Sequence, residues 1–464
     1  MSTPNGGAHG PPWPAQQPRA VIIGIDGGDW GPIRSLIDRG KMPALARLID
    51  EGVSADLRSL DTLLSPRIWT SIATGKLPIK HGIWGFHCTR GDLRAKRVWD
   101  IVREAGGSVG VFQWMATWPP EMDDAFCVPC APLSPDGRTN PPSLGFLNQL
   151  HSMGRRQYSS GGVMLRTGVS VAWNALLSGA RLGTLVEIAS LLLHRPSRRD
   201  GDRLAWYARA RCAQTRLNAD LLTRLLRRRP PTILAMLISE TDMVQHKTWG
   251  AGASGDGCPD GEWGDLVEQQ YIRADASIGR VLGALPSDAT VVVVSDHGFQ
   301  AESSVRWVHV GRLLDLLQLK GRVEAARPGM GTVYLRPAVD DSGGASVTLD
   351  SLREWLERLW ITPADTPLFT IDAKPDEIVA HCAAEAWGSA EALGQTVEFR
   401  GADRSLPLEE LLVEGSPWRG THRDTGIMVL RGPAFRRGEA LADAPLGPRH
   451  RANAPPRFGP AGRR

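Results

Sequence analysis

The sequence predicts an α/β fold built on a doubly wound, mostly parallel sheet with helices on both faces. Continuous apolar runs, typical of fully buried strands, occur at residues 20–25, 232–238 and 289–295. Segments with the spacing of amphipathic helices separate these runs. Strands that alternate with helices pack as a parallel sheet, whose ligands gather at the carboxyl ends of the strands. The residues that follow each strand are therefore the candidates for function.

Length and composition indicate a large globular protein. The chain has 464 residues, 42% apolar and 22% charged, with a formal charge of only +4. Its arginine runs are not interleaved with aromatic residues, so the sequence offers no platform for stacking single-stranded nucleic acid. Six cysteines are too few for a disulfide framework, and the Cys127–Cys130 pair lacks the second pair of a structural zinc site.

The two ends of the chain differ from the rest in composition. Residues 1–18 are rich in Gly, Pro and Gln and predict a disordered leader without the features of a secretion signal. Residues 437–464, rich in Pro, Arg and Ala, predict a disordered tail. No apolar stretch reaches the roughly 20 residues of a membrane span. We therefore expect a cytoplasmic enzyme; the sequence does not indicate its oligomeric state.

Between these ends we expect a core with two insertions. Residues 19–310 form the α/β core, which includes a helical block at about 144–229 that we interpret as a cap. Residues 311–415 form a smaller α+β lobe, and residues 416–436 return to the core with a last strand at 426–430. The helical block and the lobe carry no readable motif, so substrate specificity is expected to reside there.

Six potential metal ligands follow the predicted strands or precede the last one. Taken singly, each has an ordinary explanation, such as a helix cap, a surface pair four residues apart on a helix, or a loop histidine. Two polar residues that end a buried strand are harder to explain without a partner. Three carboxylates and three imidazoles at one sheet edge predict two adjacent divalent metal sites. The six are Asp26, Asp242, His246, Asp296, His297 and His422.

Ser65 is the candidate nucleophile. It precedes Pro66 at the start of a predicted helix that Thr74 and Gly75 end. A helix start favours negative charge, and a metal at the hydroxyl oxygen would ease formation of the alkoxide. The alternative is that Ser65 only caps the helix.

Five motifs occur in an order that resembles a known family. They are VIIGIDGGDW, LLSPRIWTSIATGKLPIKHGIWGF, DMVQH, VVVVSDHGF and GTHRDTGIMVLRGP. This set resembles type I phosphodiesterase/nucleotide pyrophosphatase-like members of the alkaline phosphatase superfamily. The resemblance implies an alkaline-phosphatase-like fold and two zinc-type ions, with manganese as an alternative. It places one ion on Asp242, His246 and His422, and the other on Asp26, Asp296 and His297 beside Ser65.

The resemblance also implies the reaction. A small phosphorylated substrate would be cleaved by a phosphodiesterase or phosphatase through a phosphoseryl intermediate on Ser65. Arg67 either helps to bind a non-bridging phosphate oxygen or lies on the surface, and His81 is interpreted as a supporting or structural residue. Phosphonate hydrolysis, phosphomutase activity and a catalytically silent phospho-ligand-binding protein are the alternatives. The spacing Ser65-Pro66-Arg67 does not match the motif of a formylglycine sulfatase.

Overall fold

The computed structural model describes most of the chain. The described residues are 19–60, 63–86, 88–155, 161–193, 196, 200–249, 264–301, 306–326, 332–338, 347–375, 377–382, 394–414 and 420–445. The predicted leader, and residues 446–464 of the predicted tail, lie outside them.

An eight-stranded sheet forms the centre of the molecule, in the order β20-β2-β19-β6-β1-β5-β3-β4. Its strands are β1 (Ala20–Ile25), β2 (Val53–Arg58), β3 (Val109–Phe112), β4 (Phe126–Val128), β5 (Ile233–Ile238), β6 (Thr290–Val294), β19 (Thr425–Arg431) and β20 (Glu439–Pro445). β6, β1, β5, β3 and β4 are parallel, β20 is parallel to β2, and β19 is antiparallel to both of its neighbours. The predicted mostly parallel α/β sheet is confirmed.

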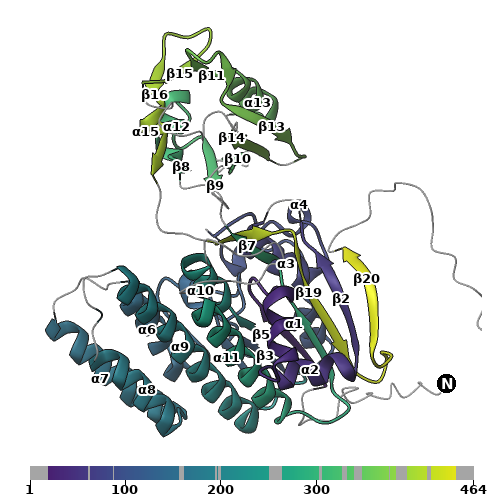
Figure 1. Cartoon of the computed structure of the whole chain (residues 1–464). Coiled ribbons are helices and arrows are strands. Elements are labelled where there is room, and N and C mark those ends of the chain that lie inside the picture. Colours follow the sequence, from purple (N-terminus) through teal and green to yellow (C-terminus); the bar gives the residue numbers. More distant parts are fainter. Residues whose placement is uncertain are drawn as a thin grey trace, which may run out of the picture.

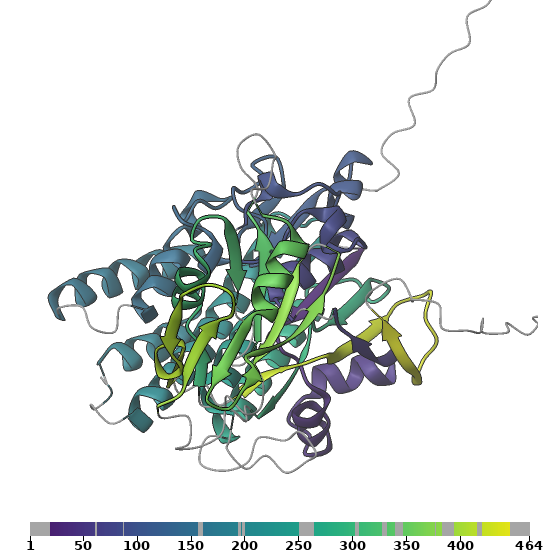
Figure 2. The ribbon, with the colours of Figure 1, turned by 90° about the horizontal axis from the view of Figure 1, so that it is seen from above.

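Helices cover both faces of this sheet (Figures 1 and 2). Along β1, Val21, Ile23 and Ile25 face one layer, whereas Ala20 and Ile22 face the other. The first layer contains α1 (Trp30–Asp38), α2 (Pro43–Asp50), α10 (Glu240–Thr248) and α11 (Gly264–Leu282), and the second contains α3 (Ser65–Thr74) and α5 (Val98–Glu104). The short α4 (Pro78–His81) follows α3. This alternation explains why β1 is apolar on every position.

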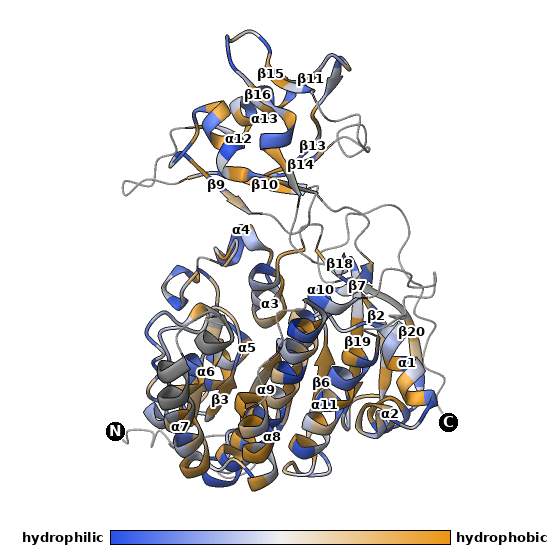
Figure 3. Ribbon diagram, turned by 60° about the vertical axis from the view of Figure 1, so that its left-hand side comes forward, coloured by the Kyte–Doolittle hydropathy of each residue, from blue (hydrophilic) through white to orange (hydrophobic). Residues whose placement is uncertain are grey.

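The helical block packs on the first-layer side of the sheet. It consists of α6 (Phe146–Arg155), α7 (Gly161–Ser178), α8 (Leu182–Leu193) and α9 (Asp200–Arg228). α9 packs against α10 and α11, and its residues Leu217 and Leu221 belong to the main core. A cap would instead cover the carboxyl ends of the strands, so the position differs from the one expected from the sequence (Figures 1 and 3). Among the described residues, no helix has the length and apolarity needed to cross a bilayer.

The smaller lobe occupies the position above the strand ends (Figure 3). It holds two four-stranded antiparallel sheets around its own apolar core. Its strands are β8 (Arg306–Val308), β9 (Val323–Ala326), β10 (Thr332–Pro337), β11 (Leu359–Thr362), β12 (Thr366–Pro367), β13 (Phe369–Ala373), β14 (Ile378–Cys382), β15 (Thr396–Phe399), β16 (Ser405–Pro407) and β17 (Leu412–Glu414). Its helices are α12 (Val310–Leu317), α13 (Leu349–Glu357) and α15 (Leu408–Leu411).

After the lobe the chain re-enters the core in two steps. β18 (Gly420–Arg423) pairs with β7 (Gly298–Ala301), so His422 lies on a strand and not in the loop that the sequence indicated. β19 then inserts between β2 and β6.

The prediction of a disordered tail from residue 437 is wrong for its first part. β20 (Glu439–Pro445) pairs in parallel with β2 and forms one edge of the sheet. Without it, the hydrogen-bonding groups along that side of β2 would be unpaired, and pairing satisfies them regardless of the low apolarity of the added strand.

Candidate metal centre and nucleophile

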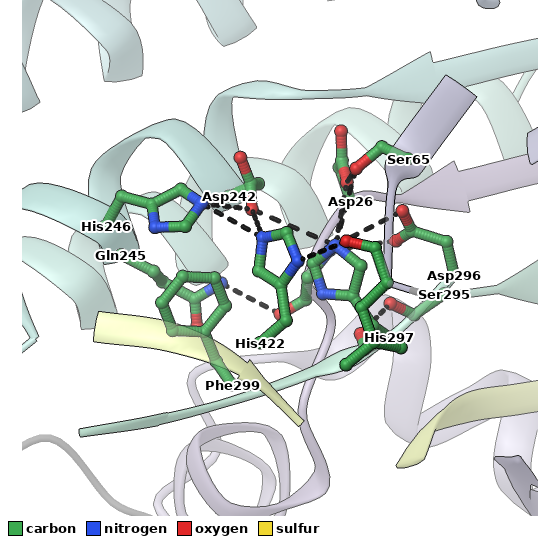
Figure 4. A network of polar contacts seen from close by, with 12 residues as sticks. Asp26, Ser65, Asp242, Gln245, His246, Ser295, Asp296, His297, Phe299 and His422 are labelled. Carbon is green, nitrogen blue, oxygen red and sulfur yellow. Dashed lines mark hydrogen bonds and ion pairs between the residues drawn. The ribbon is translucent and has the colours of Figure 1, made fainter. Parts of the chain in front are cut away.

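Asp26 is brought to the centre by a tight turn at the end of β1. Gly27 has a φ of 68°, and its backbone N–H donates to Oδ1 of Asp296 over 3.2 Å. A Cβ at this position would lie 2.9 Å from Nε2 of Gln245. Because L side chains rarely adopt this φ and the space is filled, the turn requires glycine. It sets the carboxylates that follow β1 and β6 side by side (Figure 4).

Three residues form what we call the histidine-rich group: Asp242, His246 and His422. Oδ1 of Asp242 lies 3.3 Å from Nε2 of His246 and 3.2 Å from Nε2 of His422. The two Nε2 atoms are 3.0 Å apart. α10 supplies the first two side chains one helical turn apart, and β18 supplies the third. Three potential ligand atoms therefore converge on one point (Figure 4).

The hydrogen bonds of the imidazoles determine which ring nitrogen is free. Nδ1 of His246 lies 2.9 Å from the carbonyl oxygen of Gly420. Nδ1 of His422 lies 3.0 Å from that of Leu63, and Nδ1 of His297 lies 3.0 Å from that of Gly298. A carbonyl only accepts, so we assign the proton of each neutral ring to Nδ1. The three Nε2 lone pairs then face the centre, as they do in metal-binding histidines.

The second set, the aspartate-rich group, comprises Asp26, Asp296 and His297. Nε2 of His297 lies 3.7 Å from Oδ1 of Asp26 and 3.3 Å from Oδ2 of Asp296. All three side chains are almost completely buried, and Oδ2 of Asp296 accepts no hydrogen bond. Two buried carboxylates with an unsatisfied oxygen are costly unless a cation compensates them.

The two groups are neighbours. Nε2 of His297 lies 4.0 Å from Oδ1 of Asp242, and the rings of His297 and His422 stack with centroids 3.6 Å apart. Ligand atoms of Asp242, His297 and His422 also lie within 4.8 Å of one another. The spacing suits two ions about 4 Å apart, as in two-metal hydrolases.

Burial and mutual repulsion shift the pKa values of the aspartate-rich group. Desolvation, followed by the charges of Asp296 and Asp242, raises the pKa of Asp26 well above its usual value. Burial and the charge of Asp242 raise the pKa of Asp296 to about 6. Burial lowers the pKa of His297 well below that of a free imidazole, so this ring stays neutral and cannot balance the two carboxylates.

The histidine-rich group balances its own charge. Burial opposes ionisation of Asp242, but the adjacent His246 and His422 hold its pKa well below the usual value. Burial likewise opposes protonation of His246, but Asp242 raises its pKa. In the metal-free protein a proton on His246 can therefore stabilise the carboxylate, and a bound cation would take the place of that proton.

Ser65 lies against the aspartate-rich group. Its Oγ is 3.3 Å from Oδ1 of Asp26 and 3.4 Å from Nε2 of His297. The helix cap is Leu64, and no side chain caps α3. The interpretation of Ser65 as a simple N-cap is therefore wrong, and its hydroxyl is directed to the candidate ligands.

The donor set fits divalent ions. Around a tetrahedral zinc ion with bonds of about 2.0–2.1 Å, ligand atoms lie about 3.3 Å from one another. The separations within the histidine-rich group are 3.0–3.3 Å. In the aspartate-rich group, Nε2 of His297 lies 3.3 and 3.7 Å from the two carboxylates. Ser65 Oγ, as a fourth donor, lies 3.3 Å from Asp26 and 3.4 Å from His297.

Several residues that hold the backbone around the two ligand groups were not predicted from the sequence. Asp29 is buried: its Oδ1 accepts from Gly31 N over 2.8 Å, and its Oδ2 accepts from Phe299 N over 2.9 Å and from Arg423 over 2.6 Å. Gln245 donates to the Gly27 carbonyl over 2.8 Å. Only Asp29, just before a helix, had a readable signal as a cap.

Two residues considered from the sequence lie outside the ligand groups. His81 is buried against Ser71, with Nε2 3.0 Å from its hydroxyl oxygen, and its Nδ1 accepts from the N–H of Ile83. This contact is structural. Arg67 is buried too, and its guanidinium donates to Glu377 of the lobe over 2.6 Å. It is not a surface side chain.

Comparison with known proteins places the chain in a family. Phosphonoacetate hydrolase from Sinorhizobium meliloti 1021 in complex with phosphonoformate is 16% identical, with 92% of this chain and 93% of that chain covered and a TM-score of 0.46. Human ectonucleotide pyrophosphatase/phosphodiesterase 5 is 13% identical, with 92% and 91% covered and a TM-score of 0.46. No curated protein sequence is a significant match. The family model described as type I phosphodiesterase/nucleotide pyrophosphatase matches residues 20–375. The chain therefore belongs to this family of phosphoric ester hydrolases.

Proposed function

We propose that this chain hydrolyses a small phosphate ester by attack of Ser65 on phosphorus, with two divalent ions bound by the two groups. Zinc suits this mixed nitrogen and oxygen donor set best, and manganese is also accommodated. The observation that carries the proposal is the pair of Nε2 atoms of His246 and His422, 3.0 Å apart with both Nδ1 atoms on carbonyls. Two lone pairs at this distance repel unless a cation, or a proton on one of the rings, lies between them.

The chain's own residues account for the nucleophile. Ser65 begins α3, where unpaired N–H groups and the helix dipole favour a negatively charged oxygen. Asp26 and His297 hold the Ser65 oxygen at 3.3 and 3.4 Å. The depressed pKa of His297 keeps its ring neutral, and the contact of Nδ1 with the Gly298 carbonyl leaves Nε2 without a proton. Bound ions would supply Lewis-acid stabilisation of the charge on the attacking and leaving oxygens.

The proposed reaction has two displacements. In the first, the Ser65 hydroxyl loses its proton to solvent, the bond from its Oγ to phosphorus forms and the bond to the leaving oxygen breaks. The leaving oxygen takes up a proton from solvent and departs as the alcohol. In the second, water attacks phosphorus, the serine is regenerated, and phosphate or a phosphomonoester is released. A cytoplasmic location and a small phosphorylated substrate belong to the same proposal. Assays of aryl phosphate monoesters, diesters and phosphonates with zinc or manganese would identify the substrate class.

The substitution Ser65→Ala tests the nucleophile. We expect turnover of the best aryl ester to fall by at least about a thousandfold, because the covalent route is lost, while both ions are retained. Acid-quenched wild-type enzyme should carry phosphate on the peptide that contains Ser65. Ser277→Ala is the matched control, since this buried hydroxyl on α11 only donates to the carbonyl of Arg273.

Substantial residual turnover by the Ser65→Ala variant would remove Ser65 as the nucleophile. Fewer than about one ion per chain after metal-replete purification would count against the metal-dependent mechanism itself.

A further inference from the structure

The segment that carries Ser65 is in contact with the lobe on both sides of the nucleophile. Leu64, one residue before, packs in an apolar cluster with Trp84 of the core and with Tyr334 and Val379 of the lobe. Tyr334 and Val379 are direct partners on the neighbouring strands β10 and β14.

Arg67, two residues after Ser65, makes the second contact. Its guanidinium donates to Oε2 of Glu377 over 2.6 Å, and Nε1 of Trp84 donates to the same oxygen over 2.7 Å. The side chains of Arg67 and Glu377 are only 6% and 1% exposed. A buried pair of this kind is held in one geometry, because moving either partner leaves the other charge unpaired.

The candidate metal ligands contact residues 63–67 on the side of the strand ends, opposite the lobe. Nδ1 of His422 is bonded to the carbonyl of Leu63, and the Ser65 hydroxyl contacts Asp26. Residues 63–67 are thus held between the strand ends and the lobe.

We propose that Glu377 is a positioning residue for the reaction, acting through Arg67 to fix the backbone that presents Ser65. This inference rests on the proposed function. It gives the lobe an indirect part in catalysis, because a nucleophile displaced by about 1 Å can lose about a hundredfold in rate.

Kinetics of two single variants test this role. Glu377→Gln keeps the shape and the acceptor but removes the charge, and Arg67→Lys keeps the charge but removes the planar guanidinium. We expect kcat to fall by about 10- to 100-fold in each, with KM for a small aryl ester and metal content nearly unchanged. Glu354→Gln, an exposed carboxylate on α13 of the same lobe, is the matched control.

Two further measurements separate positioning from simple stabilisation. Guanidinium ion should restore part of the kcat of Arg67→Ala, which a purely structural role would not allow. Amide hydrogen exchange over residues 63–68 should increase in Glu377→Gln, and this readout needs no turnover. It therefore distinguishes failure of the inference from failure of the proposed function. A Glu377→Gln variant with unchanged kcat and unchanged exchange overturns the inference.

A separate feature of the surface supports a second inference. The hairpin of α7 and α8 exposes apolar side chains on its outer side, each 45% to 77% accessible. These residues are Val169, Trp173, Leu176, Leu177, Leu182, Val186 and Leu193. Their spacing of about one or two helical turns places them along one stripe of each helix. Val171, Ala175 and Ile188, on the opposite sides, are buried in the main core. Contiguous apolar patches of this kind mark interaction surfaces.

The charges around the hairpin indicate the partner. Between residues 167 and 193 only Arg181 and Glu187 are charged, and Glu187 is bonded to Arg216 and Arg273. At the turn between the helices, Arg181 is 56% exposed and its Nε lies 3.5 Å from the buried carboxylate of Asp220.

More arginines lie close to this turn. The side chain of Arg224 packs beside Gly179, and Arg227 and Arg228 are exposed on the last turn of α9. An apolar face bordered by arginines complements a membrane surface with anionic headgroups. Two copies of the hairpin would bring like charges together. We infer that this hairpin docks on anionic lipid bilayers without crossing them.

Vesicle flotation tests the docking. The protein should float with phosphatidylcholine vesicles that contain phosphatidylserine, less with pure phosphatidylcholine, and less as salt is raised. Trp173→Ser combined with Leu177→Ser should abolish flotation, and Arg227→Glu with Arg228→Glu should weaken it severalfold. Ile101→Ser, an exposed apolar residue on α5, is the matched control.

Absence of flotation, or equal loss with Ile101→Ser, overturns the inference. A dimer in light scattering that Leu177→Ser dissociates would show that a second copy covers this face instead.

Discussion

The two ligand groups differ in how the charge of their buried carboxylates is compensated. The histidine-rich group has one carboxylate with two imidazoles, and those imidazoles hold the pKa of Asp242 low. The aspartate-rich group has two carboxylates and one imidazole whose pKa burial has lowered. Without a metal, protonation of His246 can compensate the charge of the first group, whereas the second group has no imidazole that takes up a proton. Ser65 lies beside the second, where the uncompensated negative charge would otherwise oppose an alkoxide.

The largest expected effect is the loss of the ion in the aspartate-rich group. Asp296→Ala should remove that ion and reduce kcat/KM by about a thousandfold, roughly 4 kcal/mol of transition-state stabilisation. Elemental analysis and steady-state kinetics measure both quantities. Asp288→Ala, an exposed aspartate just before β6, should change neither.

The histidine-rich group should tolerate damage somewhat better. His422→Ala removes one ligand of an ion that is not in contact with Ser65, and we expect a loss of about a hundredfold with one ion retained. His381→Ala, on the exposed side of β14, serves as control. Unchanged metal stoichiometry in both Asp296→Ala and His422→Ala would contradict the assignment of these groups.

The free energy of unfolding of the metal-free protein should change in opposite directions when a carboxylate of each group is neutralised. Asp296→Asn removes a buried charge whose pKa is raised to about 6 and should stabilise the stripped protein by roughly 1 to 3 kcal/mol at pH 8. Asp242→Asn should instead destabilise it, because it removes the charge that its two imidazole neighbours stabilise. Urea unfolding in the presence of a chelator measures both changes. Equal signs would show that the two groups do not differ as described.

The smallest expected effect is the pH dependence of the stabilisation by Asp296→Asn. The folded-state pKa of Asp296, about 6, lies above that of an unfolded aspartate, so ionisation costs the folded state stability above pH 6. This cost decreases as the pH falls from 6 towards about 4, the pKa of an unfolded aspartate. The advantage of Asp296→Asn over the metal-free parent should therefore shrink between pH 8 and pH 5. An advantage that is constant over this range would assign it to packing.

The site residues that could be predicted from the sequence are those that follow the buried parallel strands. Asp26 and Asp296 were identified because parallel buried strands deliver their next residues to a common edge. The spacing of Asp242 and His246 fits one face of α10. The candidate residues follow from the pattern of strands and polar residues, whereas their division into two sites follows from the resemblance to a family.

The remaining features depend on contacts between distant segments. Arg67 and Glu377 are 310 positions apart, and nothing near either residue indicates that they pair. The role of β20 depends on the open edge of β2, which a local pattern does not reveal. His422 was expected in a loop because its strand, β18, is only four residues long and pairs with β7, far away in the sequence.

Anomalous diffraction from crystals grown with zinc would test the central claim most directly. We expect two peaks about 4 Å apart. One should be bounded by Asp242, His246 and His422, and the other by Asp26, Asp296 and His297, within bonding distance of the Ser65 hydroxyl. A single peak remote from Ser65, or no peak among these residues, would contradict it.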